Sequence, residues 1–281
     1  MSSVCAITGT SGYVGSRVAE HLSAAGWTVR RLGRSDGDVR FELADPVPAA
    51  AFDAVDALVH VAYDFGCQGW REIQRVNVDG SRRLFAAARA AGIEAIVCIS
   101  TVAAFPGARS NYGRAKLEIE RAAFQAGACV VRPGLVWGPH GGAIFGALDR
   151  AVRRLPVVPL PAPPGLEIVL VNEDDLAELL ARILESWPEA SGELVVAASE
   201  EPLSFGALLR SLVSGEGRPP RVVRLPWRLA WLGLRALELV GVTPPFRSDS
   251  LVGLVAVDAD PLSRATANAE RFGVHVRPYL P

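Results

Sequence analysis

A glycine-rich segment near the N-terminus constrains the fold of this chain more than any other feature. Residues 8–15 read TGTSGYVG, between an apolar run that begins at Val4 and an alanine-rich helical pattern. In a chain with 27 glycines the GxxGxxG spacing alone is weak, and its place between strand and helix carries the prediction. Glycines there permit close backbone approach, and free helix amides attract a pyrophosphate. We expect a dinucleotide site that includes Gly9, Ser11, Gly12, Tyr13, Val14 and Gly15.

Short β-branched runs alternate with alanine-rich stretches through the first half of the chain. This alternation predicts an α/β fold, a Rossmann-type doubly wound parallel sheet covered by helices. The expected strands are Val4 to Thr8, Thr28 to Leu32, Asp38 to Phe41, Ala57 to Ala62, Ala95 to Ser100 and Ala128 to Arg132. The expected helices are Tyr13 to Ala25, Trp70 to Ala91 and Asn111 to Ala126, each followed by a capping glycine.

The pattern changes after Pro133, where prolines crowd the stretch from Pro156 to Pro164. We expect residues 1–165 to form an NAD(P)-binding Rossmann domain and residues 166–281 a smaller, mainly substrate-binding α/β subdomain. Its expected elements are a strand from Ile168 to Val171, a helix from Asp174 to Trp187, a strand from Leu194 to Ala197 and three or four more helical stretches. The boundary stays open, because the strand from Ile168 could rejoin the first sheet.

Composition narrows the functional classes. A formal charge of -1 gives no global field for nucleic acid or an anionic membrane. No signal peptide and no run of 18 uncharged apolar residues is evident, and the four dispersed cysteines have no CxxC pair. We expect buried free thiols and a cytoplasmic protein. The four dispersed histidines predict no metal site, and no GxSxG motif supports a hydrolase.

The end of the second expected strand bears on the choice of cofactor. It lacks the carboxylate that would accept the ribose hydroxyls of NAD, and Gly33 leaves space there. Arg30 or Arg34 could pair with a 2'-phosphate, unless both are merely solvated surface groups. The segment favours NADP, with NAD possible.

A tyrosine and a lysine define the candidate catalytic centre. Lys116 is the single lysine among 29 basic residues, and Tyr112 precedes it by four positions, which places both on one helix face. An ammonium near a phenol stabilises the phenolate and lowers the tyrosine pKa, as general acid/base catalysis requires. Ser100 and Thr101 end the fifth expected strand, at the edge where such sheets bind ligands, although a Ser-Thr pair there is more often a turn or cap.

Together these residues resemble the extended short-chain dehydrogenase/reductase superfamily, the NAD(P)-dependent epimerase/dehydratase type. Further matches are Glu42-Leu43 with Asp45 for an adenine contact, His60-Val61-Ala62 followed by Tyr63 for a cofactor segment, Asn77 to Ser81 for a helix motif, Arg132 to Pro139 for a strand that contacts nicotinamide through Pro133 and Val136, and Val171 to Ala177.

The resemblance implies a role for each matched residue. Tyr112 would exchange the substrate proton, Lys116 would hold the nicotinamide ribose, and Thr101 would bind the reacting oxygen with Ser100 as the fallback. Two departures stand out, because only ten residues separate Thr101 from Tyr112, and Phe105-Pro106 replaces the usual Tyr-Gly. The resemblance also implies a homodimer through the helices at 70–91 and 111–126.

Three functions remain open. The first is a reductase or dehydrogenase acting on a ketone or secondary alcohol, and the second is a nucleotide-sugar epimerase or dehydratase with tightly bound NAD. The third is a non-catalytic NADP-sensing regulator, which the Tyr112 and Lys116 pair disfavours. The apolar stretch from Leu225 to Leu237 could line a hydrophobic pocket, be a core helix or lie on a membrane surface. A sugar diphosphate could instead use Arg218, Arg221, Arg224 and Arg247.

Overall fold

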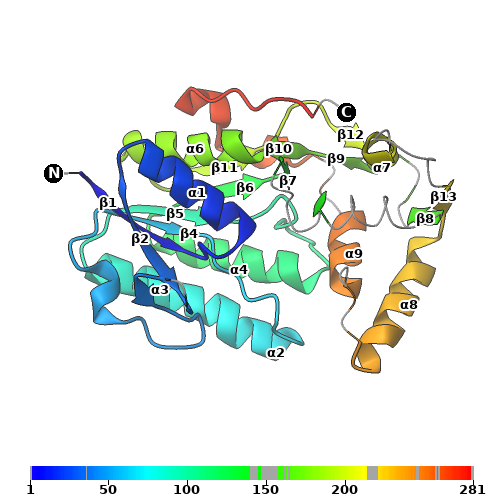
Figure 1. The fold of residues 1–281 in the computed structure, drawn as a ribbon, viewed down its shortest axis with the longest axis horizontal. Helices are drawn as coiled ribbons and strands as arrows, with labels where there is room; N and C mark the ends of the chain where they lie inside the picture. The colour runs from blue at the N-terminus through cyan, green and yellow to red at the C-terminus, as the bar shows by residue number, and fades with distance from the viewer. Residues whose placement is uncertain are drawn as a thin grey trace.

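Eight parallel strands form the central sheet of the computed structural model (Figure 1). The model describes residues 2–35, 37–139, 145–146, 157–160, 163, 165–213, 221–242, 244, 247–256, 258 and 260–279. The strand order is β14-β11-β6-β5-β4-β1-β2-β3. The strands are β1 (Val4–Thr8), β2 (Thr28–Gly33), β3 (Val39–Arg40), β4 (Ala57–His60), β5 (Ala95–Ile99), β6 (Cys129–Pro133), β11 (Leu194–Ala197) and β14 (Ala267–Asn268). The order reverses between β1 and β4, the point at which open α/β sheets bind ligands.

Both faces of the sheet are buried, as the apolar strand runs predict. Along β1, Cys5 and Ile7 enter one core and Ala6 enters the other. The first core is covered by α1 (Tyr13–Ala24) and α6 (Glu173–Glu185), and the second by α3 (Asp79–Ala90) and α4 (Asn111–Gln125) (Figure 1). The prediction of a doubly wound parallel sheet is confirmed.

Some predicted boundaries differ from those observed. The strand expected from Asp38 to Phe41 shortens to β3, because the Asp38 carboxylate accepts the amide of Arg31 at 2.8 Å instead of continuing the strand. The helix expected from Trp70 to Ala91 is divided into α2 (Trp70–Ile73), a π-helical turn (Gln74–Val78) and α3. Short 3-10 turns occupy Ala49–Phe52, Leu262–Arg264 and Ala269–Phe272.

The C-terminal part both returns to the main sheet and builds a separate lobe. The strand expected from Ile168 does not rejoin the sheet. It becomes β9 (Glu167–Ile168), paired with β12 (Leu203–Ser204), and β10 (Leu170–Asn172), paired with β7 (Leu135–Trp137). The chain returns instead through β11 and β14. The division at residue 165 therefore stays a prediction.

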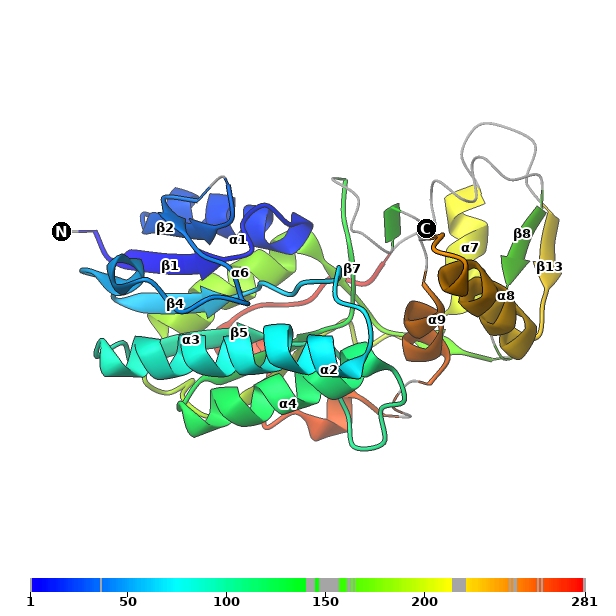
Figure 2. The same ribbon diagram turned by 90° about the horizontal axis from the view of Figure 1, so that it is seen from below.

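The lobe beyond the sheet contains the remaining helices (Figure 2). These are α7 (Phe205–Val213), α8 (Trp227–Leu239) and α9 (Ser248–Val255), beside the parallel pair β8 (Val157–Leu160) and β13 (Arg221–Arg224). The helix α9 lies between α8 and the start of α4 (Figure 2). None of the described helices combines the length and the apolar character that a membrane span needs.

Candidate active site

The glycine-rich loop makes a cradle that side chains would fill. Gly9 has a φ of +76°, and a Cβ there would stand 2.9 Å from the Ala62 backbone. A Cβ on Gly15 would stand 2.1 Å from the Gly9 carbonyl oxygen, so α1 approaches the loop closely. No side chain caps α1, and no acidic residue occupies its first turn. The loop therefore suits the pyrophosphate of a dinucleotide.

A buried polar network supports the segment beside this cradle. Thr8 Oγ1 accepts the amides of Val61 and Ala62, each at 3.1 Å, and lies 2.8 Å from His60 Nδ1. His60 Nε2 lies 2.8 Å from Ser81 Oγ, which donates its own hydrogen to the Asn77 carbonyl. Since Ser81 must then accept from His60, the imidazole is neutral with its proton on Nε2. Burial lowers the pKa of His60 to about 3, with the Lys116 charge as a smaller cause, in agreement with that state.

The two arginines of the predicted NADP contact lie in different surroundings. Arg30 donates to the carbonyl oxygen of Asp53, and Arg34 is exposed just beyond the end of β2. Asp38 brings a carboxylate to β2 from several residues downstream, which reading the turn alone did not reveal. Arg34 is therefore the freer of the two arginines to meet a phosphate.

The predicted adenine contact lies between the sheet and α3. Leu43 is buried, and its carbonyl accepts Arg83 Nη2 at 2.8 Å. Gly80 allows α3 to approach, since a Cβ there would stand 2.3 Å from the same carbonyl. Glu42 pairs with Arg40 at 3.0 Å.

The structure brings Thr101, Tyr112 and Lys116 to the carboxyl edge of β5. Thr101 follows β5, its Oγ1 accepts the Ala103 amide at 3.2 Å, and its side chain hydrogen-bonds Tyr112. Lys116 is buried and donates from Nζ to the Ile99 carbonyl oxygen at 2.8 Å. Both catalytic candidates on α4 therefore face the end of this strand.

The pKa of Tyr112 departs from the expectation. Burial raises it above its ordinary value and outweighs the hydrogen bond to Thr101, which favours the phenolate. Burial also lowers the pKa of Lys116, whose ammonium is held by Ile99 and lies 5.4 Å from the Tyr63 ring. The expectation that Lys116 lowers the tyrosine pKa is not met here. The phenol is protonated at neutral pH, which suits a proton donor.

Aromatic side chains surround the phenol. The Tyr63 ring lies 5.0 Å from the Tyr112 ring in an edge-on contact, and the Phe65 ring lies 5.5 Å away. Phe65 is 64% exposed, so the cluster opens to solvent on one side. Tyr63, predicted to contact the cofactor, thus lies against the candidate catalytic residue.

The Ser100 hydroxyl is hydrogen-bonded to a buried ion pair and not to the candidate catalytic residues. Its hydroxyl donates to Glu120 Oε1 at 2.5 Å, and the same carboxylate binds Arg132 through Nε at 2.7 Å and Nη2 at 2.6 Å. All three side chains are buried. Since Ser100 has given its only hydrogen to Glu120, Thr101 is the better placed hydroxyl for a substrate oxygen.

The predicted nicotinamide strand divides at Gly134, between β6 and β7. Pro133 is buried, and its carbonyl accepts the Val102 amide at 3.1 Å, which links β6 to the loop after Thr101. Val136 is half-buried beside the first core. Pro133 ends β6, the strand beside β5 and Thr101, whereas Val136 lies in β7, which pairs with β10 outside the central sheet.

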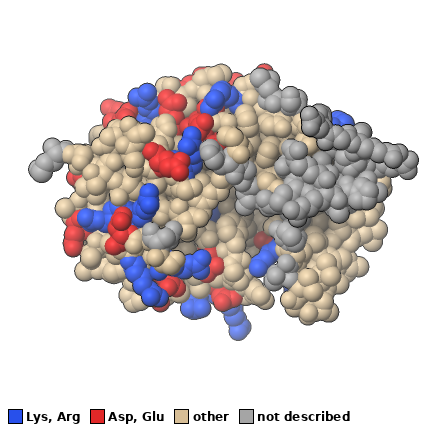
Figure 3. All heavy atoms as spheres, viewed as in Figure 1, with Lys and Arg blue, Asp and Glu red and all other residues tan. Residues whose placement is uncertain are grey.

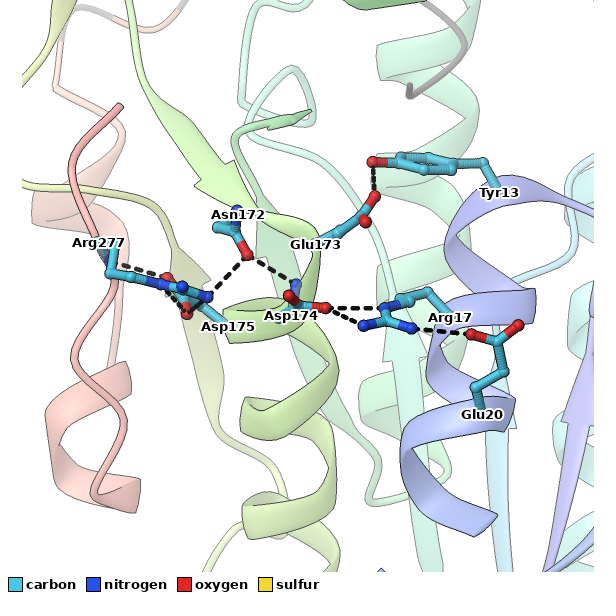
Figure 4. A network of polar contacts seen from close by, with 8 residues as sticks. All are labelled: Tyr13, Arg17, Glu20, Asn172, Glu173, Asp174, Asp175 and Arg277. Atoms are coloured by element: carbon cyan, nitrogen blue, oxygen red, sulfur yellow. Dashed lines mark hydrogen bonds and ion pairs between the residues drawn. The ribbon is translucent and has the colours of Figure 1, made fainter. Parts of the chain in front are cut away.

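A polar network joins α1 to the start of α6 (Figure 4). Tyr13 donates to the buried Glu173 carboxylate, and Arg17 binds Asp174 through Nε at 2.7 Å. A Cβ at Gly138 would stand 2.2 Å from the Glu173 carboxyl carbon, so the Glu173 side chain packs directly against this glycine. Sequence analysis did not single out Glu173, whose signal is a carboxylate at the end of the apolar run before α6.

The acidic residues that follow Glu173 make structural contacts. Asn172 is the N-cap of α6 and accepts the Asp174 amide at 2.9 Å, while Arg277 binds both Asn172 and Asp175 (Figure 4). The residues that the structure describes contain no cluster of metal-binding side chains. His140 and Arg218 lie outside the described residues.

The helix α8 is not a core helix, because none of its residues is buried. Leu229 and Leu232 are 58% and 59% exposed, and Leu239 is 73% exposed. With Val252 of α9, its first half lines a hollow of about 510 Å³ whose walls include Trp227 and Trp231. Figure 3 shows basic and acidic groups interleaved over the sheet, with few around α8 at the lower right.

Comparison with known proteins decides the family. The model of the NAD dependent epimerase/dehydratase family matches residues 5–193, which is more than half of the chain. This chain belongs to that family. The epimerase/dehydratase match includes the glycine-rich loop, Thr101, Tyr112 and Lys116, and it confirms the resemblance that the motifs indicated.

Relatives in the epimerase/dehydratase family include reductases. The ceramide reductase of Caulobacter vibrioides is 29% identical over 237 residues, covering 79% of this chain and 74% of its own. The 2-alkyl-3-oxoalkanoate reductase of Shewanella oneidensis is 24% identical over 275 residues, covering 83% and 71%. The solved structure of MoeE5 in complex with UDP-glucose and NAD has the same fold, with a TM-score of 0.71, 19% identity and coverage of 90% and 97%. The protein is an NAD(P)-dependent enzyme.

Proposed function

We propose that this enzyme is an NADP-preferring reductase that interconverts a hydrophobic ketone and its secondary alcohol. The observation that carries the proposal is the half-buried phenol of Tyr112 beside the Thr101 hydroxyl, with Lys116 one helical turn further on. When bound, the nicotinamide supplies or accepts the hydride. The residues of the chain position the substrate and handle its proton.

Each residue has a defined task in this proposal. The Thr101 hydroxyl binds the reacting oxygen, and Tyr112 donates its proton to that oxygen during reduction. Burial raises the pKa of the Tyr112 phenol, so the free enzyme holds the protonated form that reduction requires. Lys116 holds the cofactor ribose, while the amides at the start of α1 bind the pyrophosphate.

Two observations support a hydrophobic substrate. The lobe beside α4 exposes an apolar surface on α8, next to α9. The two reductases among the relatives are named for ceramide and for a 2-alkyl-3-oxoalkanoate, and both compounds carry alkyl chains. We therefore place the substrate in the class of ketones with an alkyl substituent.

Arg34 supports the preference for NADP. It is exposed just beyond β2, and its guanidinium can form paired hydrogen bonds with a 2'-phosphate. Fluorescence titration with NADPH and NADH tests this, and Arg34→Ala should weaken NADPH binding about tenfold while NADH binding stays the same. Binding of NADH at least as tight as that of NADPH would contradict the preference.

The reaction is tested with ethyl 3-oxodecanoate, ethyl acetoacetate and UDP-glucose, following NADPH oxidation and product formation. We expect reduction of the long-chain ester in preference to the short one. Tyr112→Phe should reduce turnover at least a hundredfold. Tyr279→Phe, which removes the phenol hydroxyl that lies 3.1 Å from Ser211, is the matched control. Retained NAD together with turnover of UDP-glucose would favour an epimerase or dehydratase instead.

We also propose a cytoplasmic homodimer that associates through α3 and α4. Four buried free cysteines support a reducing compartment, and burial raises the pKa of the Cys5, Cys98 and Cys129 thiols to about 12. Light scattering coupled to gel filtration would measure the mass in solution. A monomer at all concentrations would contradict the dimer.

A further inference from the structure

The start of α4 is held by a side chain from the C-terminal lobe. Asp249 Oδ1 accepts the Asn111 amide at 2.7 Å, and Asp249 Oδ2 accepts the Tyr112 amide at 3.1 Å. The helix supplies its own cap only for the next amide, since Ser110 Oγ accepts from Gly113 at 3.1 Å. Two of the first three amides of α4 are therefore satisfied across a separation of 137 and 138 residues.

This contact bears directly on the candidate catalytic residue. The backbone of Tyr112 is fixed by Asp249 on one side, while its ring is fixed by Tyr63 and Phe65 on the other. A tyrosine side chain has two rotatable torsions, so the position of its hydroxyl follows the backbone closely once the ring is packed. Movement of α9 would therefore move the phenol relative to Thr101.

The helix α9 is in turn bound to α8. The Ser248 amide donates to Glu238 Oε1 at 2.8 Å, and Ser248 Oγ donates to Glu238 Oε2 at 2.7 Å. Glu238 also pairs with Arg235 at 3.3 Å. A continuous set of polar contacts thus runs from α8, through the first two residues of α9, to the backbone of Tyr112.

We propose that Asp249 is a positioning residue that couples the C-terminal lobe to Tyr112. The inference rests on the proposed function, in which Tyr112 exchanges the substrate proton. Asp249 does not touch the reacting atoms in this scheme. Its carboxylate fixes the first turn of α4, so that the phenol stands beside Thr101 when the α8 and α9 lobe is in place.

The Asp249 carboxylate accepts the two backbone amides better than an asparagine side chain would. The two backbone donors use separate oxygens, so Asp249→Asn keeps one acceptor and turns an amide group toward the other donor. Asp249→Ala keeps no hydrogen-bond acceptor for either amide. A positioning role predicts a graded loss of turnover in this order, because misplacement by about 1 Å can reduce a rate a hundredfold.

The experiment measures kcat and KM with ethyl 3-oxodecanoate and NADPH, together with NADPH affinity and the melting temperature. We expect kcat to fall about tenfold in Asp249→Asn and about a hundredfold in Asp249→Ala, with unchanged NADPH affinity. The matched control is Asn268→Ala, which removes a 3.1 Å cap to the Arg271 amide away from α4 and should keep its kcat. If the alanine variant does not fold, the asparagine variant decides.

The possible failures are distinct. Wild-type kcat in Asp249→Asn and Asp249→Ala, beside an inactive Tyr112→Phe, would overturn the positioning role alone. A fully active Tyr112→Phe would overturn the proposed function and the positioning role with it. A fall in kcat of Asn268→Ala as large as that of Asp249→Ala would show a general stability effect, and would also overturn the proposal.

Discussion

Breaking the buried ion pair beneath the candidate site should destabilise the protein strongly. Glu120 and Arg132 join α4 to β6 through two hydrogen bonds of 2.6 and 2.7 Å, with their side chains only 2% and 7% exposed. Ser100 adds a third bond to the same carboxylate. Glu120→Gln removes the negative charge and leaves the Arg132 guanidinium buried without its counter-charge.

The structure sets the size of the effect. Removing one partner of a buried ion pair lowers the free energy of unfolding by about 3–5 kcal/mol, because the remaining charge is uncompensated. At about 2 °C per kcal/mol for a chain of this size, the melting temperature should fall by about 6–10 °C. The exposed pair Glu118 and Arg121 on the same helix is the control, with side chains 40% and 63% exposed. Glu118→Gln should lower the free energy by less than about 0.5 kcal/mol.

Urea unfolding followed by circular dichroism measures both variants. The double variant Glu120→Leu with Arg132→Met tests the physical cause, since it removes both charges and should recover most of the lost stability. A loss below about 1 kcal/mol in Glu120→Gln would refute the reasoning. The reasoning would also be refuted if the double variant lost more free energy of unfolding than the two single variants lose together.

Three further changes test the remaining parts of the site. Lys116→Arg should lower turnover about tenfold or more, because a guanidinium does not fit the buried site where the ammonium contacts β5. Arg121→Lys on the same helix is the control and should keep wild-type turnover. Wild-type turnover in Lys116→Arg would refute this reasoning. Gly15→Ala should abolish NADPH binding by fluorescence titration, because its Cβ would stand 2.1 Å from a loop carbonyl, while Gly233→Ala on α8 meets no atom within 4 Å and should still bind. His60 has a folded pKa of about 3, so below pH 6.5 only the unfolded chain takes up its proton, and urea unfolding should show stability falling from pH 6.5 toward 3. In His60→Asn that pH dependence should be shallower.

The sequence located the features that depend on neighbours along the chain. The glycine-rich loop, the buried strands and the spacing of Tyr112 and Lys116 are local patterns, and the loop and six of the strands stand at or near the predicted positions. Periodicity is set by the geometry of a single strand or helix, so it is visible before any packing is known. The family match then confirmed the resemblance that these patterns had indicated.

Features built from distant segments could not be predicted from the sequence. The pairing of Asp249 with α4, the contact of Glu173 with Tyr13 and the return of β11 to the sheet join residues far apart in the chain. The direction of the Tyr112 pKa shift could not be predicted either, because burial and not the neighbouring lysine is its largest cause. The sequence by itself determined the fold class and selected the candidate catalytic residues, because both follow from local spacing. Only the tertiary structure decided what surrounds those residues, because burial and hydrogen bonding between distant segments are properties of the packed chain.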